Sequence, residues 1–226
     1  MYNFTSTENW RVFRVMAEFI ESIEFMANVG ISVSVFGSAR TQPDNKYYQQ
    51  AVEIGKLFAE RGISVITGGG PGIMEAANKG AAEAKGRNKG GSIGLNIELP
   101  FEQKPNPFAK HVKNFHYFFI RKIMFVKYAK AVIIMPGGYG TMDEFFEVIT
   151  LLQTKKISKI PIILVGSAFW GPLISFFRGH ILKEGLIEKG DLNLFTVVDT
   201  PEDAVALVLK HIRQTTKKIT DNITYH

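Results

Sequence analysis

The sequence contains no cysteine among its 226 residues. A chain without thiols has no disulfide framework, no thiolate metal site and no thiol chemistry. Long apolar runs are also missing, because no window approaches the ~20 apolar residues that span a bilayer. The first residues lack a basic head followed by an apolar stretch, which is the pattern of a secretory signal. We therefore expect a cytoplasmic protein without membrane contact.

Two familiar kinds of catalytic motif are missing as well. The five histidines show no metal-ligand spacing and no H-E-x-x-H pattern, so we expect no metal, although His116 is a candidate to border a site. Residues 90–94 match G-x-S-x-G, but a serine nucleophile must stand on a turn between a strand and a helix. Ser92 falls inside a predicted strand, and this argues against a serine hydrolase.

What the chain does have is an excess of positive charge. It carries 27 Lys and Arg against 21 Asp and Glu, a net charge of +6, and 46% of its residues are hydrophobic. A basic globular protein attracts anions such as nucleotides, nucleic acids or phosphorylated metabolites. Much of the excess lies in residues 209–220, and we interpret residues 214–226 as a basic polar tail.

The apolar pattern alternates between short strands and helices. We predict strands at 31–37, 63–70, 91–97, 112–118, 160–166 and 194–199, helices at 8–28, 45–62, 71–86, 119–130, 169–185 and 200–214, and a strand followed by a helix at 132–149. Such alternation indicates a parallel sheet covered on both faces. We therefore expect an α/β fold over residues 1–213, a single doubly wound, Rossmann-like and mostly parallel sheet. The helix within residues 1–30 would pack on the core or on a partner subunit.

Three predicted strands end in glycine-rich turns: "FGSAR" (36–40), "TGGGPG" (67–72) and "MPGGYGT" (135–141). In doubly wound sheets, ligands bind outside the carboxyl ends of the strands, where the strand order reverses. We therefore expect the functional site where these turns meet. In the first turn Ser38 and Arg40 are candidates, with Arg40 placed to contact phosphate or base, or to form a surface salt bridge.

The second turn predicts an anion site. Glycines allow positive φ and close ligand approach, and the helix that follows presents unpaired N–H groups to a phosphate. The candidate ligands are Gly69, Gly70 and Gly72. Pro71 would lie in the first helical turn, and Glu75 would bind ribose hydroxyls or favour the helix dipole. The alternative is a tight turn without a ligand. No Gly-Lys-Ser/Thr follows, and Ile73 stands where a dinucleotide fingerprint has Gly or Ala, so neither a P-loop nor an NAD site is expected.

The third turn combines N–H groups with a nearby carboxylate. Its candidate phosphate ligands are Gly137, Gly138, Gly140 and Thr141. Glu144 follows three residues after Thr141, the spacing of a capping box, so Glu144 either caps the helix or serves the site. Asp143 is the carboxylate that could cap in its place.

Arg121 and Lys122 stand near the start of an otherwise apolar helix. Cations there oppose the helix dipole, so a bound anion or the carboxylate of Glu144 would have to favour them. We take Lys122 as a candidate phosphate ligand. The alternative is that Lys122 is solvated and Arg121 caps a neighbouring element.

The segments "GGGPGIMEAANKGA", "RKIMF" and "PGGYGTMDE" resemble the LOG family of cytokinin riboside 5′-monophosphate phosphoribohydrolases, whose relatives were long labelled lysine decarboxylase-like. The resemblance runs from about Val33 to Ile174. It implies hydrolysis of a purine nucleoside 5′-monophosphate, AMP-like or a cytokinin ribotide, to free base and ribose 5-phosphate. It also implies that no metal or cofactor is needed and that the protein forms a homodimer or higher oligomer with sites near the subunit interface.

The resemblance implies roles for particular residues. The catalytic arginine and glutamate of the family fall on Arg121 and Glu144, and its phosphate-holding segment falls on residues 137–141. Phe118 and Phe119 stand where plant-type members have Met-His, so the base preference stays open. No lysine is marked out as a Schiff-base partner of pyridoxal phosphate, and the decarboxylase label therefore has no support in the sequence.

Two other classes of function remain. A non-catalytic nucleotide sensor or cofactor carrier could use the same cradle, but phosphate binding alone needs no Arg121 and Glu144 pair. The basic tail permits DNA binding, yet we find no recognition helix and no basic stripe interleaved with aromatics, which argues against specific nucleic-acid binding. In the enzyme, Glu144 would stabilise positive charge at the sugar carbon and steer a water molecule, while Arg121 would hold the substrate and balance charge.

Overall fold

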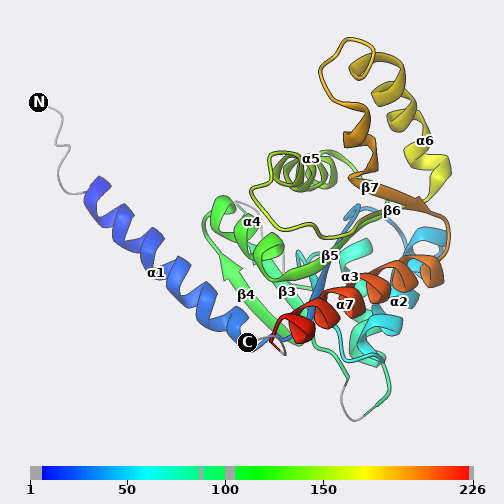
Figure 1. The fold of residues 1–226 in the computed structure, drawn as a ribbon. Coiled ribbons are helices and arrows are strands. Elements are labelled where there is room, and N and C mark those ends of the chain that lie inside the picture. The colour runs from blue at the N-terminus through cyan, green and yellow to red at the C-terminus, as the bar shows by residue number, and fades with distance from the viewer. Residues whose placement is uncertain (1–6, 87–88, 100–104, 224–226) are drawn as a thin grey trace, which may run out of the picture.

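The computed structural model of the protein describes residues 7–86, 89–99 and 105–223. Its centre is a seven-stranded sheet in the order β4-β3-β2-β1-β5-β6-β7, in which neighbouring strands pair in parallel (Figure 1). The strands are β1 (Ser32–Phe36), β2 (Ser64–Thr67), β3 (Ser92–Ile97), β4 (His111–Phe115), β5 (Ala129–Ile134), β6 (Ile162–Val165) and β7 (Phe195–Val198). The predicted α/β, doubly wound architecture is confirmed.

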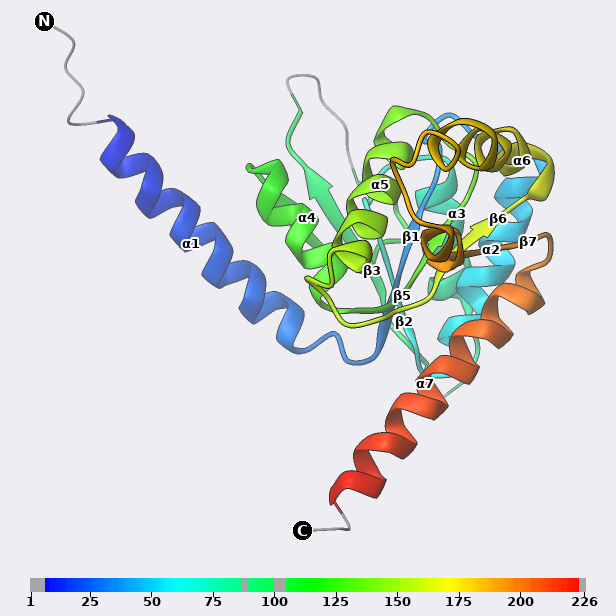
Figure 2. The same ribbon diagram turned by 45° about the horizontal axis from the view of Figure 1, so that its top comes forward.

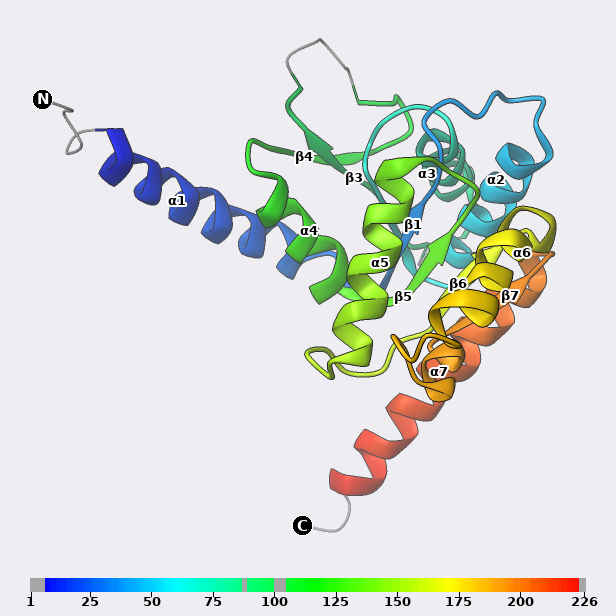
Figure 3. The same ribbon diagram turned by 90° about the horizontal axis from the view of Figure 1, so that it is seen from above.

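Helices cover both faces of the sheet, as the view from above shows (Figure 3). They are α1 (Thr7–Ala27), α2 (Lys46–Ala59), α3 (Ile73–Glu83), α4 (Phe118–Lys127), α5 (Tyr139–Gln153), α6 (Ser167–Phe176) and α7 (Pro201–Ile223), with a π-helical turn at Phe177–Ile181 and a 3-10 helix at Lys189–Asn193. One buried apolar cluster joins the sheet to α2, α3 and α7, and the other joins it to α1, α4, α5 and α6.

The helices pack closely because small residues stand where they meet. An added Cβ at Gly55 of α2 would collide with the carbonyl oxygen of Ala77, and one at Gly80 of α3 would collide with that of Val52. Phe58 on this face and Phe145 on the opposite face are fully buried. Each contributes roughly 1.5–3 kcal/mol of hydrophobic free energy relative to exposure.

The strand order reverses between β1 and β5. From β1 the chain adds β2, β3 and β4 on one side, and it then returns to add β5, β6 and β7 on the other. The loops that follow β1 and β5 therefore diverge toward opposite faces, which leaves a crevice at the carboxyl ends of these strands. The two loops are tied at their start, where Ser38 N donates to Pro136 O at 3.0 Å.

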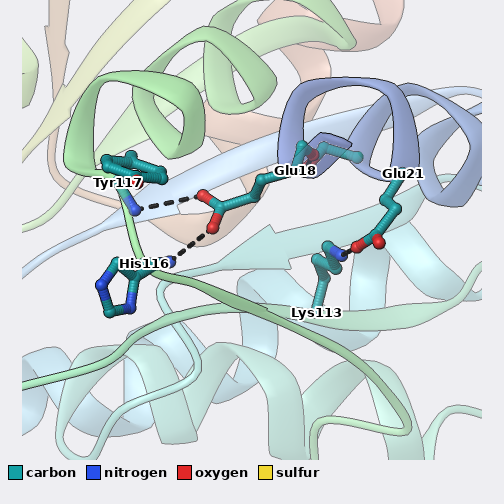
Figure 4. A network of polar contacts seen from close by, with 6 residues as sticks. Glu18, Glu21, Lys113, His116 and Tyr117 are labelled. Carbon is teal, nitrogen blue, oxygen red and sulfur yellow. Dashed lines mark hydrogen bonds and ion pairs between the residues drawn. The ribbon is translucent and has the colours of Figure 1, made fainter. Parts of the chain in front are cut away.

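Helix α1 runs outward beside β4 and α4 and extends beyond the sheet (Figure 2). The Glu18 carboxylate accepts hydrogen bonds from the backbone N–H groups of His116 (3.0 Å) and Tyr117 (3.1 Å), and Glu21 pairs with Lys113 at 2.6 Å (Figure 4). These polar contacts anchor the helix to the edge of the sheet. In the part of the chain that the structure describes, no helix is long and apolar enough to cross a membrane.

Several element boundaries differ from the prediction. β4 ends at Phe115 and α4 already begins at Phe118, and the helix predicted at 169–185 is α6, which ends at Phe176 and is followed by a π-helical turn at Phe177–Ile181. α3 begins at Ile73 and leaves Pro71 outside the helix, because Gly72 adopts a left-handed φ of +68° at the helix cap. α4 ends at Lys127, and β5 already begins at Ala129. α7 continues to Ile223, so residues 214–223 extend a helix where we expected a polar tail, and residues 224–226 lie outside the described part of the chain.

Candidate active site

A cavity of about 870 Å³ opens at the carboxyl ends of β1, β2, β3 and β5, where the strand order reverses. Its polar and glycine lining consists of Gly37, Ser38, Arg40, Gly68, Asn96, Arg121, Gly137, Gly138, Gly140, Thr141, Asp143 and Glu144. A cavity of this size is typical of small-molecule sites. The structure thus brings the proposed catalytic pair and the third glycine turn to one hollow.

Arg121 is held at the ends of two strands. It is the fourth residue of α4, and its Nε donates to Leu95 O at 2.6 Å while Nη2 donates to Gly68 O at 3.3 Å. The guanidinium also lies 5.1 Å from the centre of the Phe125 ring. Burial lowers the pKa of Arg121 to about 10, and the charge of Glu144 opposes this shift. The side chain is therefore a fixed cation at neutral pH, and it bonds to neighbouring strand ends in addition to facing the cavity.

Glu144 is a buried carboxylate on α5 with 8% of its surface exposed. Within the described residues, its Oε2 atom is buried and has no hydrogen-bond partner. Burial raises the pKa of Glu144 to about 7. Lys122 and Arg121 act to lower this pKa, whereas Glu147 and Asp143 raise it. A carboxyl group that titrates near neutral pH is suited to exchange protons with a substrate or a water molecule.

The helix-capping alternative for Glu144 is wrong. α5 begins at Tyr139 with Gly138 as its N-cap, and the cap makes no side-chain hydrogen bond. Thr141 therefore lies in the first turn and Glu144 in the second, beyond the N–H groups that a cap satisfies. Asp143 does not cap either, because its Oδ2 pairs with Lys122 Nζ at 2.8 Å.

The third glycine turn presents bare backbone to the cavity. An added Cβ at Gly138 or Gly140 would meet no atom within 4 Å, whereas one at Gly137 would overlap the Thr141 side chain. The turn leads directly into α5, whose first N–H groups lack carbonyl partners within the helix. Open space beside free N–H groups at a helix N-terminus is suited to an anion such as a phosphate. Ser38 and Arg40 line the cavity from the β1 side.

The second glycine turn plays a different part, since only Gly68 among its glycines lines the cavity. The N–H of Gly69 donates to Thr67 Oγ1 at 3.0 Å, and the carbonyl of Gly70 accepts from Asn106 Nδ2 at 3.0 Å. At Gly72 an added Cβ would collide with the backbone of Ser38 and Ala39. These three glycines therefore shape the wall behind the cavity, and the structure does not place them on its surface.

Lys122, Glu75 and His116 also lie outside the cavity lining. Lys122 pairs with Asp143 and with Glu147, the latter at 2.9 Å. Glu75 Oε1 accepts a hydrogen bond from the Tyr48 hydroxyl at 3.0 Å. His116 stands near α1, where its ring pairs with Glu98 at 2.8 Å. Within the described residues, no group of three or more His, Asp or Glu side chains is arranged to hold a metal ion.

Two features of the site were not predicted from the sequence. The first is an apolar wall formed by Met74, Leu99, Phe118 and Met142. The second is a buried hydrogen-bond network below the second turn. In this network Asn78 accepts from Thr67 Oγ1 at 2.5 Å and donates to Ser92 Oγ at 3.0 Å. The signal for the network was an asparagine within the alanine-rich segment "EAANKGAA", a position that a buried helix face rarely gives to a polar residue.

The fold is that of a Rossmann-like protein, and the cavity lies at its topological switch point, where such folds bind ligands. A family model described as possible lysine decarboxylase matches residues 74–208. The cytokinin riboside 5′-monophosphate phosphoribohydrolase LOG of Oryza sativa subsp. japonica is 32% identical over 180 residues, covering 78% of this chain and 71% of that protein. The chain therefore belongs to the LOG family.

Other relatives carry related names. A pyrimidine/purine nucleotide 5′-monophosphate nucleosidase of Escherichia coli (strain K12) is 33% identical over 146 residues, which cover 61% of this chain and 32% of that protein. Among solved structures, a Moco carrier protein from Chlamydomonas reinhardtii matches with a TM-score of 0.57 at 24% identity, over 81% of this chain and 98% of that one. The second likeness shows a shared fold.

Proposed function

We propose that the protein hydrolyses the N-glycosidic bond of a purine nucleoside 5′-monophosphate to free base and ribose 5-phosphate. The observation that carries this proposal is the shared cavity, in which a buried carboxylate and a fixed guanidinium stand beside a bare glycine turn at a helix N-terminus. The glycine turn suits the phosphate of a nucleotide, Glu144 suits its sugar, and the apolar residues of the lining suit its base.

The third glycine turn would bind the 5′-phosphate. The N–H groups at the start of α5 and the hydroxyl of Thr141 supply donors, and Arg40 supplies a positive charge from the opposite loop. This binding energy acts far from the bond that breaks, so it can orient the ribose toward Glu144 one helical turn further on. The apolar wall, with Phe118 and Met142, would then contact the base.

Glu144 would act on the sugar. As the bond between C1′ and the base nitrogen breaks, its electron pair leaves with the base and positive charge builds at C1′. The ionised carboxylate stabilises that charge and orients a water molecule, whose oxygen bonds to C1′. The water loses a proton to Glu144, Glu144 releases that proton to solvent, and the departing base nitrogen takes up one proton from solvent, so that the carboxylate is regenerated and the protons balance. Arg121 balances the negative charge that develops on the base or holds the ribose.

The proposal is tested by incubating the purified protein with AMP, GMP, CMP and a cytokinin ribotide and separating free base from nucleotide by chromatography. We expect base release from a purine nucleotide, and a loss of about 10²–10⁴-fold in kcat for Glu144→Gln. Glu24→Gln, at an exposed position of α1, is the matched control. Tight nucleotide binding without base release would identify a sensor or carrier, and near-normal turnover by Glu144→Gln would remove that residue from the mechanism.

A further inference from the structure

Lys122 forms a bridge between two helices at the level of Glu144. Its Nζ lies 2.8 Å from Asp143 Oδ2 and 2.9 Å from Glu147 Oε2, and only 20% of its side chain is exposed. Asp143 directly precedes Glu144, and Glu147 follows it by three residues on the same helix. One ammonium group on α4 thus holds the two carboxylates that flank Glu144 on α5.

The bridge also sets the relation between the two proposed catalytic residues. Lys122 follows Arg121 directly in α4, and Arg121 donates hydrogen bonds to Leu95 O within β3 and to Gly68 O just after β2. Its neighbour Lys122 reaches across to α5. Through these two residues α4 connects the strand ends to the helix that carries Glu144.

The charges around Glu144 give Lys122 a second effect. Two cations, Lys122 and Arg121, favour the ionised form of Glu144. Two carboxylates, Glu147 and Asp143, oppose it. The effect of Lys122 is the largest of these four charge effects. Burial lowers the pKa of Lys122, but its pairing with Asp143 and Glu147 and the negative charge of Glu144 together outweigh burial and raise it overall. Lys122 therefore remains a cation throughout the neutral range.

We propose that Lys122 is a positioning residue, which holds the two carboxylates that flank Glu144 on α5 and so keeps Glu144 at the cavity with a positive charge nearby, and that it is not a ligand of the substrate phosphate. The effect of Lys122 on catalysis rests on the hydrolytic function proposed above. The effect of its charge on the titration of Glu144 does not, because it is present without any substrate. Three carboxylates stand within two turns of α5, and among the described residues the cations that act on Glu144 are Lys122 and Arg121, so loss of Lys122 would leave the repulsion at Glu144 opposed mainly by Arg121.

The experiment measures the titration of Glu144 directly, by NMR of protein labelled with carbon-13 at the glutamate side-chain carboxyl, with Glu144→Gln identifying the signal. Lys122→Met removes the charge but keeps much of the side-chain length. We expect it to move the Glu144 titration upward by on the order of one pH unit. Lys122→Arg should leave the titration near that of the wild type. Lys127→Met, at an exposed position in the last turn of α4, is the control and should shift nothing.

Glu147→Gln supplies a test of opposite sign. Loss of this carboxylate removes a repulsion from Glu144 and leaves Lys122 in place, so the titration should move downward. If the bridge only held α4 and α5 together, Lys122→Met and Glu147→Gln would break the same contact and would not be expected to shift the Glu144 titration in opposite directions. If Lys122→Met fails to fold, Lys122→Gln removes the same charge with a polar side chain and should give the same upward shift.

Catalysis gives the second readout. In Lys122→Met the acidic limb of the pH profile of kcat/KM should follow the shifted titration of Glu144. An unshifted titration of Glu144 in Lys122→Met would overturn the proposal. An unshifted acidic limb together with a large rise in KM would also overturn it, because a rise in KM is expected when a phosphate ligand is lost. If the wild type releases no base from any nucleotide, the proposed hydrolysis fails, whereas the NMR shifts still test the role of Lys122.

Discussion

Gly68 and Arg121 lie so close together that a methyl group at residue 68 would require the Arg121 guanidinium to move. A Cβ on Gly68 would overlap Nη2 of Arg121 and lie 2.7 Å from the sulfur of Met74. The carbonyl of the same glycine accepts a hydrogen bond from that Nη2 atom. The end of β2 therefore both makes room for the guanidinium and holds it.

Gly68→Ala should displace Arg121 and lower kcat/KM about 10–100-fold, because a misplaced charge loses its contact with the reacting atoms. The measurement is steady-state base release by the variant. Gly171→Ala is the control, since a Cβ at Gly171 in α6 would meet no atom within 4 Å. Equal activity of the two variants would contradict the role of Arg121 in the cavity.

Gly137 and Gly138 should respond differently to alanine, although they are neighbours. A Cβ at Gly137 collides with Thr141, so Gly137→Ala should lower the melting temperature. A Cβ at Gly138 enters open space, so Gly138→Ala should melt like the wild type but bind ribose 5-phosphate roughly tenfold more weakly. Thermal melting and titration calorimetry separate the two effects. Unchanged affinity in Gly138→Ala would place the phosphate elsewhere.

The activity should depend on pH through Glu144. Its pKa is raised to about 7, and the proposed mechanism needs the ionised form. We expect kcat/KM to fall about tenfold for each pH unit below that value, and to be nearly constant above it. The pH profile of kcat/KM with the best nucleotide checks this. An acidic limb near pH 4.5, the ordinary value of a glutamate, would show that burial does not control the reaction.

Glu144→Gln should stabilise the fold at pH 8. A carboxyl group whose pKa is raised from 4.5 to about 7 by burial binds its proton more tightly in the folded state. Its contribution to the free energy of unfolding is therefore present below pH 4.5 and is lost as the pH rises to about 7. The ionised group costs the wild type up to about 3 kcal/mol at pH 8. Denaturant unfolding of both proteins at pH 5 and pH 8 measures the difference, which should grow with pH.

A large part of the fold and of the candidate site could be predicted because the relevant patterns are local. Strand β5 is a short apolar run that ends in Pro136-Gly137-Gly138, and such a run is recognisable without its neighbours. The parallel sheet follows from the alternation of strands and helices, and the position of the site follows from the reversal of strand order. Arg121 and Glu144 were selected by their motifs, and both line the cavity.

The remaining features depend on contacts between segments far apart in the chain. Lys122 was expected at the phosphate, but its partners lie on α5, and only the packing of two helices shows this. Gly69 looked like an anion ligand, yet its N–H is satisfied by Thr67 within the buried network. The spacing of Thr141 and Glu144 fits a capping box, and only the first residue of α5 showed that Glu144 does not cap this helix.

The amino-acid sequence by itself determined the layered α/β fold, the three glycine turns and the residue types available for catalysis, because hydrophobic period and backbone freedom act over a few neighbouring residues. Only the tertiary structure decided which turn borders the cavity, which cation Glu144 meets and how far its pKa rises. Burial and charge–charge distance are properties of packed elements, and residues 121 and 144 come within range of each other only when α4 and α5 lie on the same face of the sheet.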